Sequence, residues 1–184
     1  MCTFNTLLLP ASANLDAVNA IARETLHQTF TAQGNEAIEK AVGQGARSYV
    51  KAGLHCDCGS GLARISRPRD SGPTDRELRK LRADGWSETK IQRWLDQRAA
   101  TLEKREAEYE ARHGGLPANV AAWTEFVQKI LDDLAPWVGL FTHDYRGSVQ
   151  TERIDFGAVR RLAISVEHIG EIEADVPFVF TQSS

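Results

Sequence analysis

The stretch PANVAAWTEFVQKILDDLAP, residues 117–136, has the clearest periodicity in the chain. Its large apolar side chains recur every three or four residues, which places them on one stripe of an α-helix. The stripe consists of Trp123, Phe126, Val127, Ile130, Leu131 and Leu134. Pro136 cannot continue a helix and should end this one. We therefore expect an amphipathic helix whose apolar stripe forms the centre of the core.

Segments with strand character lie on both sides of this helix. Downstream, WVGLFTHDY, RLAISVEHI and VPFVFTQ (residues 137–145, 161–169 and 176–182) are rich in β-branched and aromatic residues. Upstream, TFNTLLLP (3–10) predicts an opening strand, and RSYVKAGLHCDC (47–58) predicts one or two short strands. Helical patterns over residues 12–30 and 35–43 separate these upstream strands. The order of elements predicts an α+β fold, with a mainly antiparallel sheet and packed helices.

The middle of the chain predicts a helical hairpin inserted into this fold. A capping box formed by Thr74 and Glu77 begins its first helix, and Gly85 ends that helix. Ser87 caps a second helix of about 25 residues, or about 37 Å at 1.5 Å per residue. Apolar residues occupy only the first part of the second helix, at Ile91, Trp94, Leu95 and Leu102. We predict a single domain over residues 1–184, with the hairpin excursion at about 74–115.

Composition narrows the class of protein. A formal net charge of −3 does not favour a generally nucleic-acid-binding surface, although a local basic patch remains compatible with it. No apolar run approaches the roughly 20 residues that span a bilayer, so no membrane partner is expected. The first basic residue is Arg23, so the basic start of a secretory signal peptide is missing. An odd number of cysteines, three, favours a reducing compartment, and we expect a cytoplasmic protein.

Two of the three cysteines lie in LHCDCGSG, residues 54–61, and the third is Cys2. If residues 56–58 form a strand, Cys56 and Cys58 point to the same face. Cys2 begins a strand that can pair nearby, so the three thiols are predicted to converge. Three thiolates and one further ligand complete the tetrahedral geometry of zinc. The candidates for that fourth ligand are His143, His168 and His55, and His143 is the first choice.

The same cluster admits other interpretations. Cys56 and Cys58 fill a core face as small hydrophobic residues in the simplest one. A redox pair is another, and a disulfide within Cys-x-Cys would be strained and easily reduced. A third is an enzyme in which a cysteine or a metal-bound water at Cys2, Cys56 and Cys58 carries the chemistry.

A segment of the hairpin, LRADGWSETKIQRWL (81–95), resembles the helix-turn-helix core of bacterial DNA-binding proteins. Gly85, Trp86, Ser87 and Ile91 match the turn glycine, the apolar residue, the helix cap and the next apolar position in order. The resemblance implies a DNA-binding regulator that uses residues 75–98. Leu81 departs from the pattern, because the motif usually has a small residue there.

The preferred function is the binding of a partner without catalysis. A structural metal site with thiolate ligands would hold the N-terminus, with zinc as its possible cofactor. A protein partner is expected on the hairpin, and DNA is the alternative partner. The residues predicted to contact the partner are Arg76, Arg79, Lys80, Arg82 and Tyr109.

Overall fold

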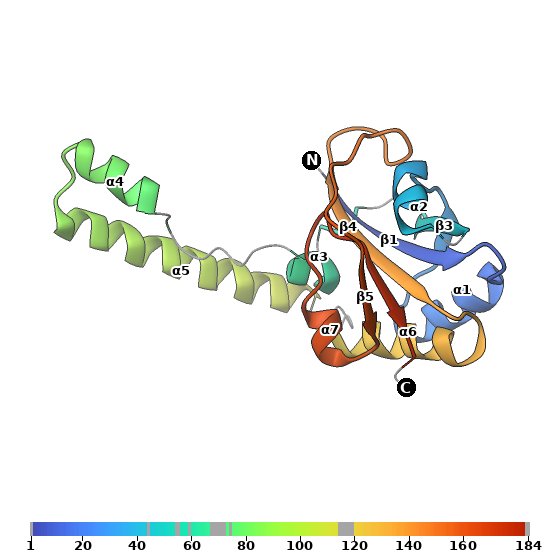
Figure 1. The fold of residues 1–184 in the computed structure, drawn as a ribbon. Helices are drawn as coiled ribbons and strands as arrows, with labels where there is room; N and C mark the ends of the chain where they lie inside the picture. The colour runs from blue at the N-terminus through green and yellow to red at the C-terminus, as the bar shows by residue number, and fades with distance from the viewer. Residues whose placement is uncertain are drawn as a thin grey trace. The chain divides into compact units, whose positions relative to one another are not determined.

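The computed structural model describes residues 2–43, 45–53, 56–58, 60–66, 73, 75–113 and 120–182. The chain divides into two compact units. The first combines residues 1–67 with residues 117–184, and the second spans residues 68–116. The excursion predicted at 74–115 falls within the second unit (Figure 1).

The first unit contains a six-stranded sheet in the order β2-β3-β1-β4-β6-β5. Its strands are β1 (Cys2–Pro10), β2 (Phe30–Ala32), β3 (Ala46–Lys51), β4 (Val138–Tyr145), β5 (Arg160–Ala163) and β6 (Phe178–Thr181). All neighbouring strands are antiparallel except β5 and β6, which are parallel. The prediction of an α+β fold with a mainly antiparallel sheet is confirmed.

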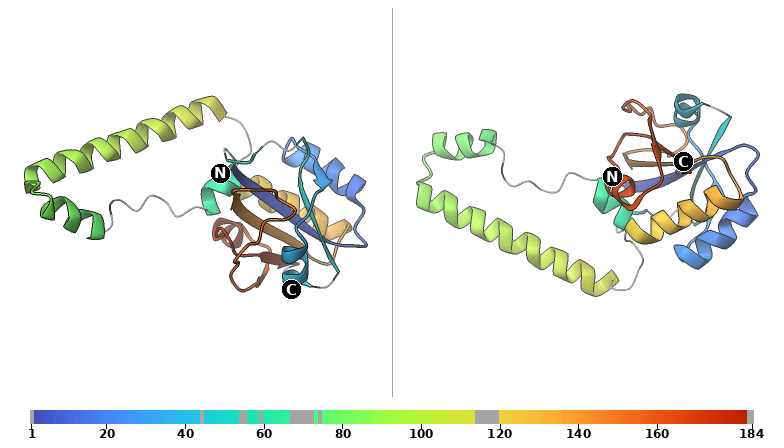
Figure 2. Two further views of the ribbon diagram at one scale, coloured as in Figure 1. Left: turned by 90° about the horizontal axis from the view of Figure 1, so that it is seen from above. Right: turned by 60° about the horizontal axis from the view of Figure 1, so that its bottom comes forward.

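Four helices cover one face of this sheet: α1 (Leu15–Thr25), α3 (Gly61–Ser66), α6 (Val120–Asp133) and α7 (Val166–Gly170). Figure 2 shows α1 and α6 side by side on this face. Five of the six residues of the predicted stripe lie in α6 and are buried, and Phe126, Val127 and Ile130 have no exposed surface. The sixth, Leu134, lies just beyond α6 and is partly buried. The stripe packs against alternate residues of the strands, including Leu7 and Phe178. The prediction that this stripe forms the centre of the core is confirmed.

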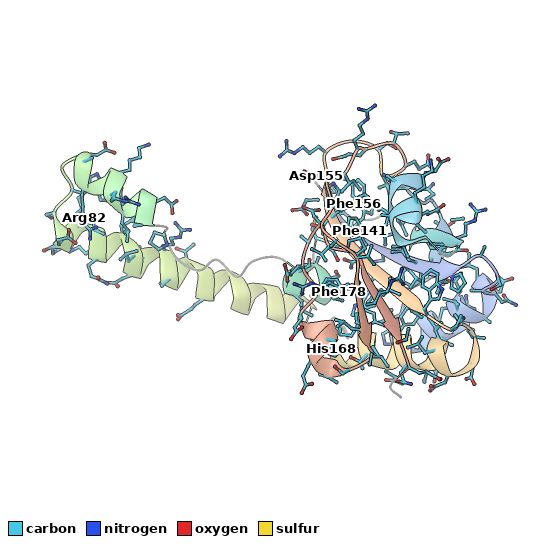
Figure 3. The ribbon with its side chains drawn as sticks, viewed as in Figure 1. Arg82, Phe141, Asp155, Phe156, His168 and Phe178 are labelled. Atoms are coloured by element: carbon cyan, nitrogen blue, oxygen red, sulfur yellow. The ribbon has the colours of Figure 1, made fainter. Side chains whose placement is uncertain are left out.

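The opposite face carries a smaller core beneath α2 (Glu36–Val42). Leu8 of β1 and Phe141 of β4 are fully buried there, and Phe156 packs against the same cluster (Figure 3). Gly139 of β4 is adjacent to Leu8, and a Cβ atom at this glycine would lie 2.8 Å from the Leu8 Cβ. β1 is therefore buried on both faces along this part, which explains its unbroken apolar run LLL, residues 7–9.

The segment RLAISVEHI and the helix predicted over residues 12–30 differ from the structure. RLAISVEHI does not form one strand: β5 ends at Ala163, and α7 begins at Val166. Ser165 causes the change, because its side chain accepts a hydrogen bond from the backbone N–H of His168 and caps the helix. The helix predicted over residues 12–30 ends at Thr25, just before His27 adopts a positive φ of 51°.

The second unit contains α4 (Asp75–Ala83) and α5 (Glu88–His113). Gly85 lies between them with φ of 80°, a left-handed conformation that glycine adopts without strain. The Ser87 hydroxyl accepts a hydrogen bond from the Lys90 backbone N–H at 3.3 Å, as predicted for a helix cap. Ile91, 2% exposed, is buried in this unit.

Candidate metal centre

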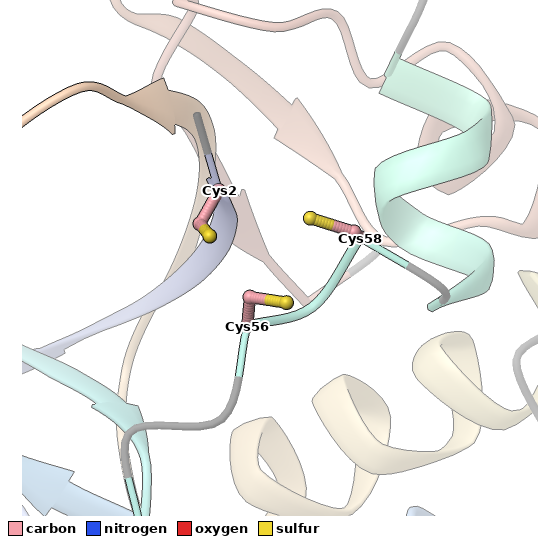
Figure 4. Close-up of side chains that lie close together, drawn as sticks. All are labelled: Cys2, Cys56 and Cys58. Atoms are coloured by element: carbon pink, nitrogen blue, oxygen red, sulfur yellow. The ribbon is translucent and has the colours of Figure 1, made fainter.

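Three cysteines from two distant parts of the chain lie together in the first unit (Figure 4). Cys2 begins β1, and Cys56 and Cys58 lie in the loop before α3. Their sulfur atoms all lie within 4.8 Å of one another. Three points with that separation lie within about 2.8 Å of a common centre, close to the Zn–S distance of about 2.3 Å. The predicted convergence is confirmed, and the cluster can hold one metal ion.

The cysteine loop is held against the part of β1 that β3 does not cover. β3 pairs with β1 only from Thr6 onward, so the backbone of Thr3 and Asn5 needs other partners on that side. Asp57 supplies two: its N–H donates to the Thr3 carbonyl at 2.7 Å, and its Oδ2 accepts from the Asn5 N–H at 2.9 Å. The Thr3 N–H donates to the Cys58 sulfur at 3.2 Å. The start of β1 therefore positions the loop.

Cys56 and Cys58 do not lie in a strand, so this part of the prediction is wrong. The alternation that it assumed is nevertheless present, because Asp57 is 3% exposed while Cys56 is exposed and Cys58 partly so. The reason is that Asp57 bonds the backbone of both Thr3 and Asn5 in β1. Its inward orientation turns the two flanking thiols toward Cys2.

A buried polar network supports Asp57. The Asn5 side-chain amide donates to the Ser60 hydroxyl at 2.8 Å, and the Thr142 hydroxyl donates to the Asn5 side-chain oxygen Oδ1 at 3.1 Å. Burial raises the pKa of Asp57, and the hydrogen bond from the Asn5 backbone opposes that rise. These polar groups are the residues that sequence reasoning missed. In the sequence, these groups were indicated by the more polar first half of β1, TFNT, which precedes its apolar second half.

The thiols influence one another. The Cys58 backbone lowers the pKa of the Cys56 thiol, but the Cys58 side chain, burial and the charges of Cys58 and Cys2 together raise it above its ordinary value. A thiolate cluster of this kind accumulates negative charge that a bound cation would neutralise.

The histidines predicted as fourth ligands lie elsewhere in the described residues. His143, on β4, has its Nδ1 2.5 Å from Asp175 Oδ1 and its Nε2 3.5 Å from Glu152 Oε1. His168 has its Nδ1 2.7 Å from the Ala163 carbonyl oxygen. Neither belongs to the cysteine cluster. His55 lies outside the described residues.

His143 instead joins two loops to β4. Asp175 precedes β6 and adopts a positive φ of 65°, and Glu152 follows β4. The Tyr145 ring meets the His143 ring edge-on at 4.5 Å, and burial raises the pKa of Tyr145 to about 12. Because carboxylates face both ring nitrogens, His143 acts here as a structural link.

The predicted partner-binding residues belong to the second unit. Arg79, Lys80 and Arg82 of α4 are exposed. Arg82 also forms two hydrogen bonds with Glu88 of α5, at 2.7 and 3.2 Å. The side chains of Arg76 and Tyr109 lie outside the described residues.

The comparisons with protein-family models, curated proteins and solved structures found no match for this chain. Among the described residues, no helix has both the length and the apolar character needed to cross a membrane. The fold and the site thus define an α+β protein with a three-cysteine cluster able to hold a metal ion.

Proposed function

We propose that this protein binds one zinc ion through Cys2, Cys56 and Cys58. The observation that supports the proposal is the approach of three sulfurs, from positions 2, 56 and 58 of the chain, to within 4.8 Å of one another. Tetrahedral zinc would bring them to about 3.8 Å apart, which requires only a small contraction. Thiolate ligands favour zinc and other soft ions over magnesium or calcium.

The hydrogen bond from the Thr3 N–H to the Cys58 sulfur supports the same proposal. A donor aimed at a sulfur stabilises the thiolate, which is the form that binds metals. Asp57 fixes the loop at the same place, so two ligands are oriented before the ion arrives. Groups that orient metal ligands in this way raise affinity.

The proposed role of the ion is structural. It would join the first residue of β1 to a loop that otherwise contacts β1 through a few hydrogen bonds. Binding free energy at such a site adds to folding free energy, because the unfolded chain has no preformed site. Zinc should therefore raise the midpoint of thermal unfolding.

Elemental analysis and a zinc titration against a competing chelator test the proposal. We expect one zinc per chain, and Cys58→Ser should weaken binding by more than about 100-fold, beyond the usual loss for a residue that only supports a ligand. The matched controls are His143→Gln and His168→Ala, which should bind zinc as the unchanged protein does. Equal zinc binding by the protein and Cys58→Ser would refute the site.

We also propose that the exposed basic residues of α4 contact a protein partner. Arg79 and Lys80 carry this proposal because both are exposed on the same short helix. The double substitution Arg79→Glu, Lys80→Glu should abolish co-purification of a native partner and leave zinc content unchanged. Salt-sensitive binding of the protein to duplex DNA, lost in the same variant, would favour the regulator instead.

A further inference from the structure

We infer that a zinc ion held by Cys2, Cys56 and Cys58 keeps one coordination position open to solvent, and that small neutral nitrogen or oxygen donors bind there. The inference rests on the proposed function, because it concerns the coordination of the same ion. Its consequence is an ion that holds the loop to β1 and still exchanges its fourth ligand with solution.

The number of ligands supports the open position. In the described part of the chain, the cluster that could hold a metal contains three cysteines and no histidine or carboxylate. Carboxylate oxygens already face both ring nitrogens of His143. Asp57, the nearest acidic residue in sequence, is buried and binds the Asn5 N–H. Three protein ligands leave a tetrahedral ion one ligand short.

The exposure of the ligands indicates where the open position lies. Cys58 is partly buried and accepts the Thr3 N–H, so it forms the deep side of the cluster. Cys2 and Cys56 are both exposed. An ion bound to all three sulfurs is therefore accessible from the side that Cys2 and Cys56 share, and water can fill the remaining position.

Charge determines the class of donor. Three thiolates outweigh the two positive charges of zinc, so the bound site carries one net negative charge. An anionic fourth ligand would add a second negative charge, whereas water or an imidazole adds none. Zinc accepts both nitrogen and oxygen donors. A neutral donor then replaces a neutral water, with no change of oxidation state and no proton released.

Cobalt(II) substituted into the full-length protein provides the test, because its visible spectrum reports its ligands. A thiolate-to-cobalt charge-transfer band should appear and should be lost in Cys58→Ser. Imidazole should then change the d–d bands in a saturable way, with one equivalent bound. Azide, a small anion, should bind more weakly than imidazole, because it adds a second unit of negative charge to the site.

His55→Ala is the variant that keeps the inference falsifiable. An imidazole titration that is the same in this variant and in the unchanged protein supports the open position. A spectrum that responds to imidazole only after His55→Ala would identify His55 as the fourth ligand and overturn the inference. Insensitivity in both proteins, or tighter binding of azide than of imidazole, would also overturn it. Absence of the charge-transfer band would instead refute the proposed metal site itself.

Discussion

The helices α6 and α5 differ in how they are stabilised. α6 has 14 residues, and six of them are buried against the sheet. α5 has 26 residues, yet among its described side chains Ile91 is the one that is buried. The longer helix makes local contacts on its surface, such as the hydrogen bond from Gln92 to Asp96 at 2.9 Å.

This comparison shows that helix length does not measure a contribution to stability. An apolar stripe that meets a sheet removes surface from water along its whole length. A helix paired with one shorter helix has little surface to bury, and exposed polar contacts add little to its stability. We therefore expect substitutions in α6 to affect the whole first unit, whereas changes in α5 should affect the second unit alone.

The largest effect is expected for Trp123→Ala. Trp123 is 3% exposed and contacts the Phe30 and Phe126 rings edge-on. Its removal should lower the free energy of unfolding by about 3–5 kcal/mol, because it leaves a cavity in the main core. Chemical denaturation measures this loss. Trp94→Ala on α5 is the matched control, and a similar loss in the control would contradict the comparison.

Ile91→Ala should produce a smaller and local effect. We expect it to destabilise the second unit by about 2 kcal/mol, the lower end for an isoleucine truncation, since two helices offer few neighbours. Hydrogen–deuterium exchange should become faster in α4 and α5. Faster exchange in the strands of the first unit would show that the two units unfold together.

Deletion of residues 68–116, with a flexible linker joining the ends, should leave a folded first unit. The sheet and α6 lie outside the deleted segment, so the free energy of unfolding of the first unit should stay within about 1 kcal/mol of its original value. Cooperative thermal unfolding measured by circular dichroism would support this expectation. A non-cooperative transition would mean that the hairpin is part of the core.

The smallest effect is expected for Glu152→Gln, and it depends on pH. Hydrogen bonds from the Gly147 and Arg146 N–H groups, with a contribution from His143, lower the pKa of Glu152 below its ordinary value of 4.5. A lowered pKa in the folded state stabilises the protein above the unfolded pKa, and this stability is lost as pH falls through the folded pKa.

The free energy of unfolding of the first unit should therefore be lower in Glu152→Gln than in the unchanged protein at neutral pH. This difference should become smaller in acid. Denaturation series at several pH values check this. A difference that grows on acidification would contradict the assigned direction.

Periodicity predicted much of the fold. The stripe of α6, the strand TFNTLLLP, the Ser87 cap and the turn at Gly85 all follow from spacing that local geometry requires. The error at Ser165 has a local cause too, because a short apolar run fits a strand or a helix equally well. There a single hydroxyl cap was sufficient to favour the helix.

The metal centre was predictable only in part. The sequence identified the three cysteines, and their common orientation followed from a strand alternation that survives in a loop. The surroundings of His143, the first choice of fourth ligand, could not be predicted from the sequence in the same way. Its two carboxylate neighbours, Asp175 and Glu152, come from loops 32 and 9 residues away in the chain.

The sequence by itself predicted most of the helices and strands, the side chains that are apolar enough to be buried, and the thiols that are available as ligands. Only the tertiary structure decided that the start of β1, which β3 does not cover, would bind Asp57 and so bring Cys56 and Cys58 to Cys2. The physical reason is that local periodicity acts over a few residues. An unpaired backbone edge, in contrast, takes its hydrogen-bond partners from whichever segment the fold brings to it.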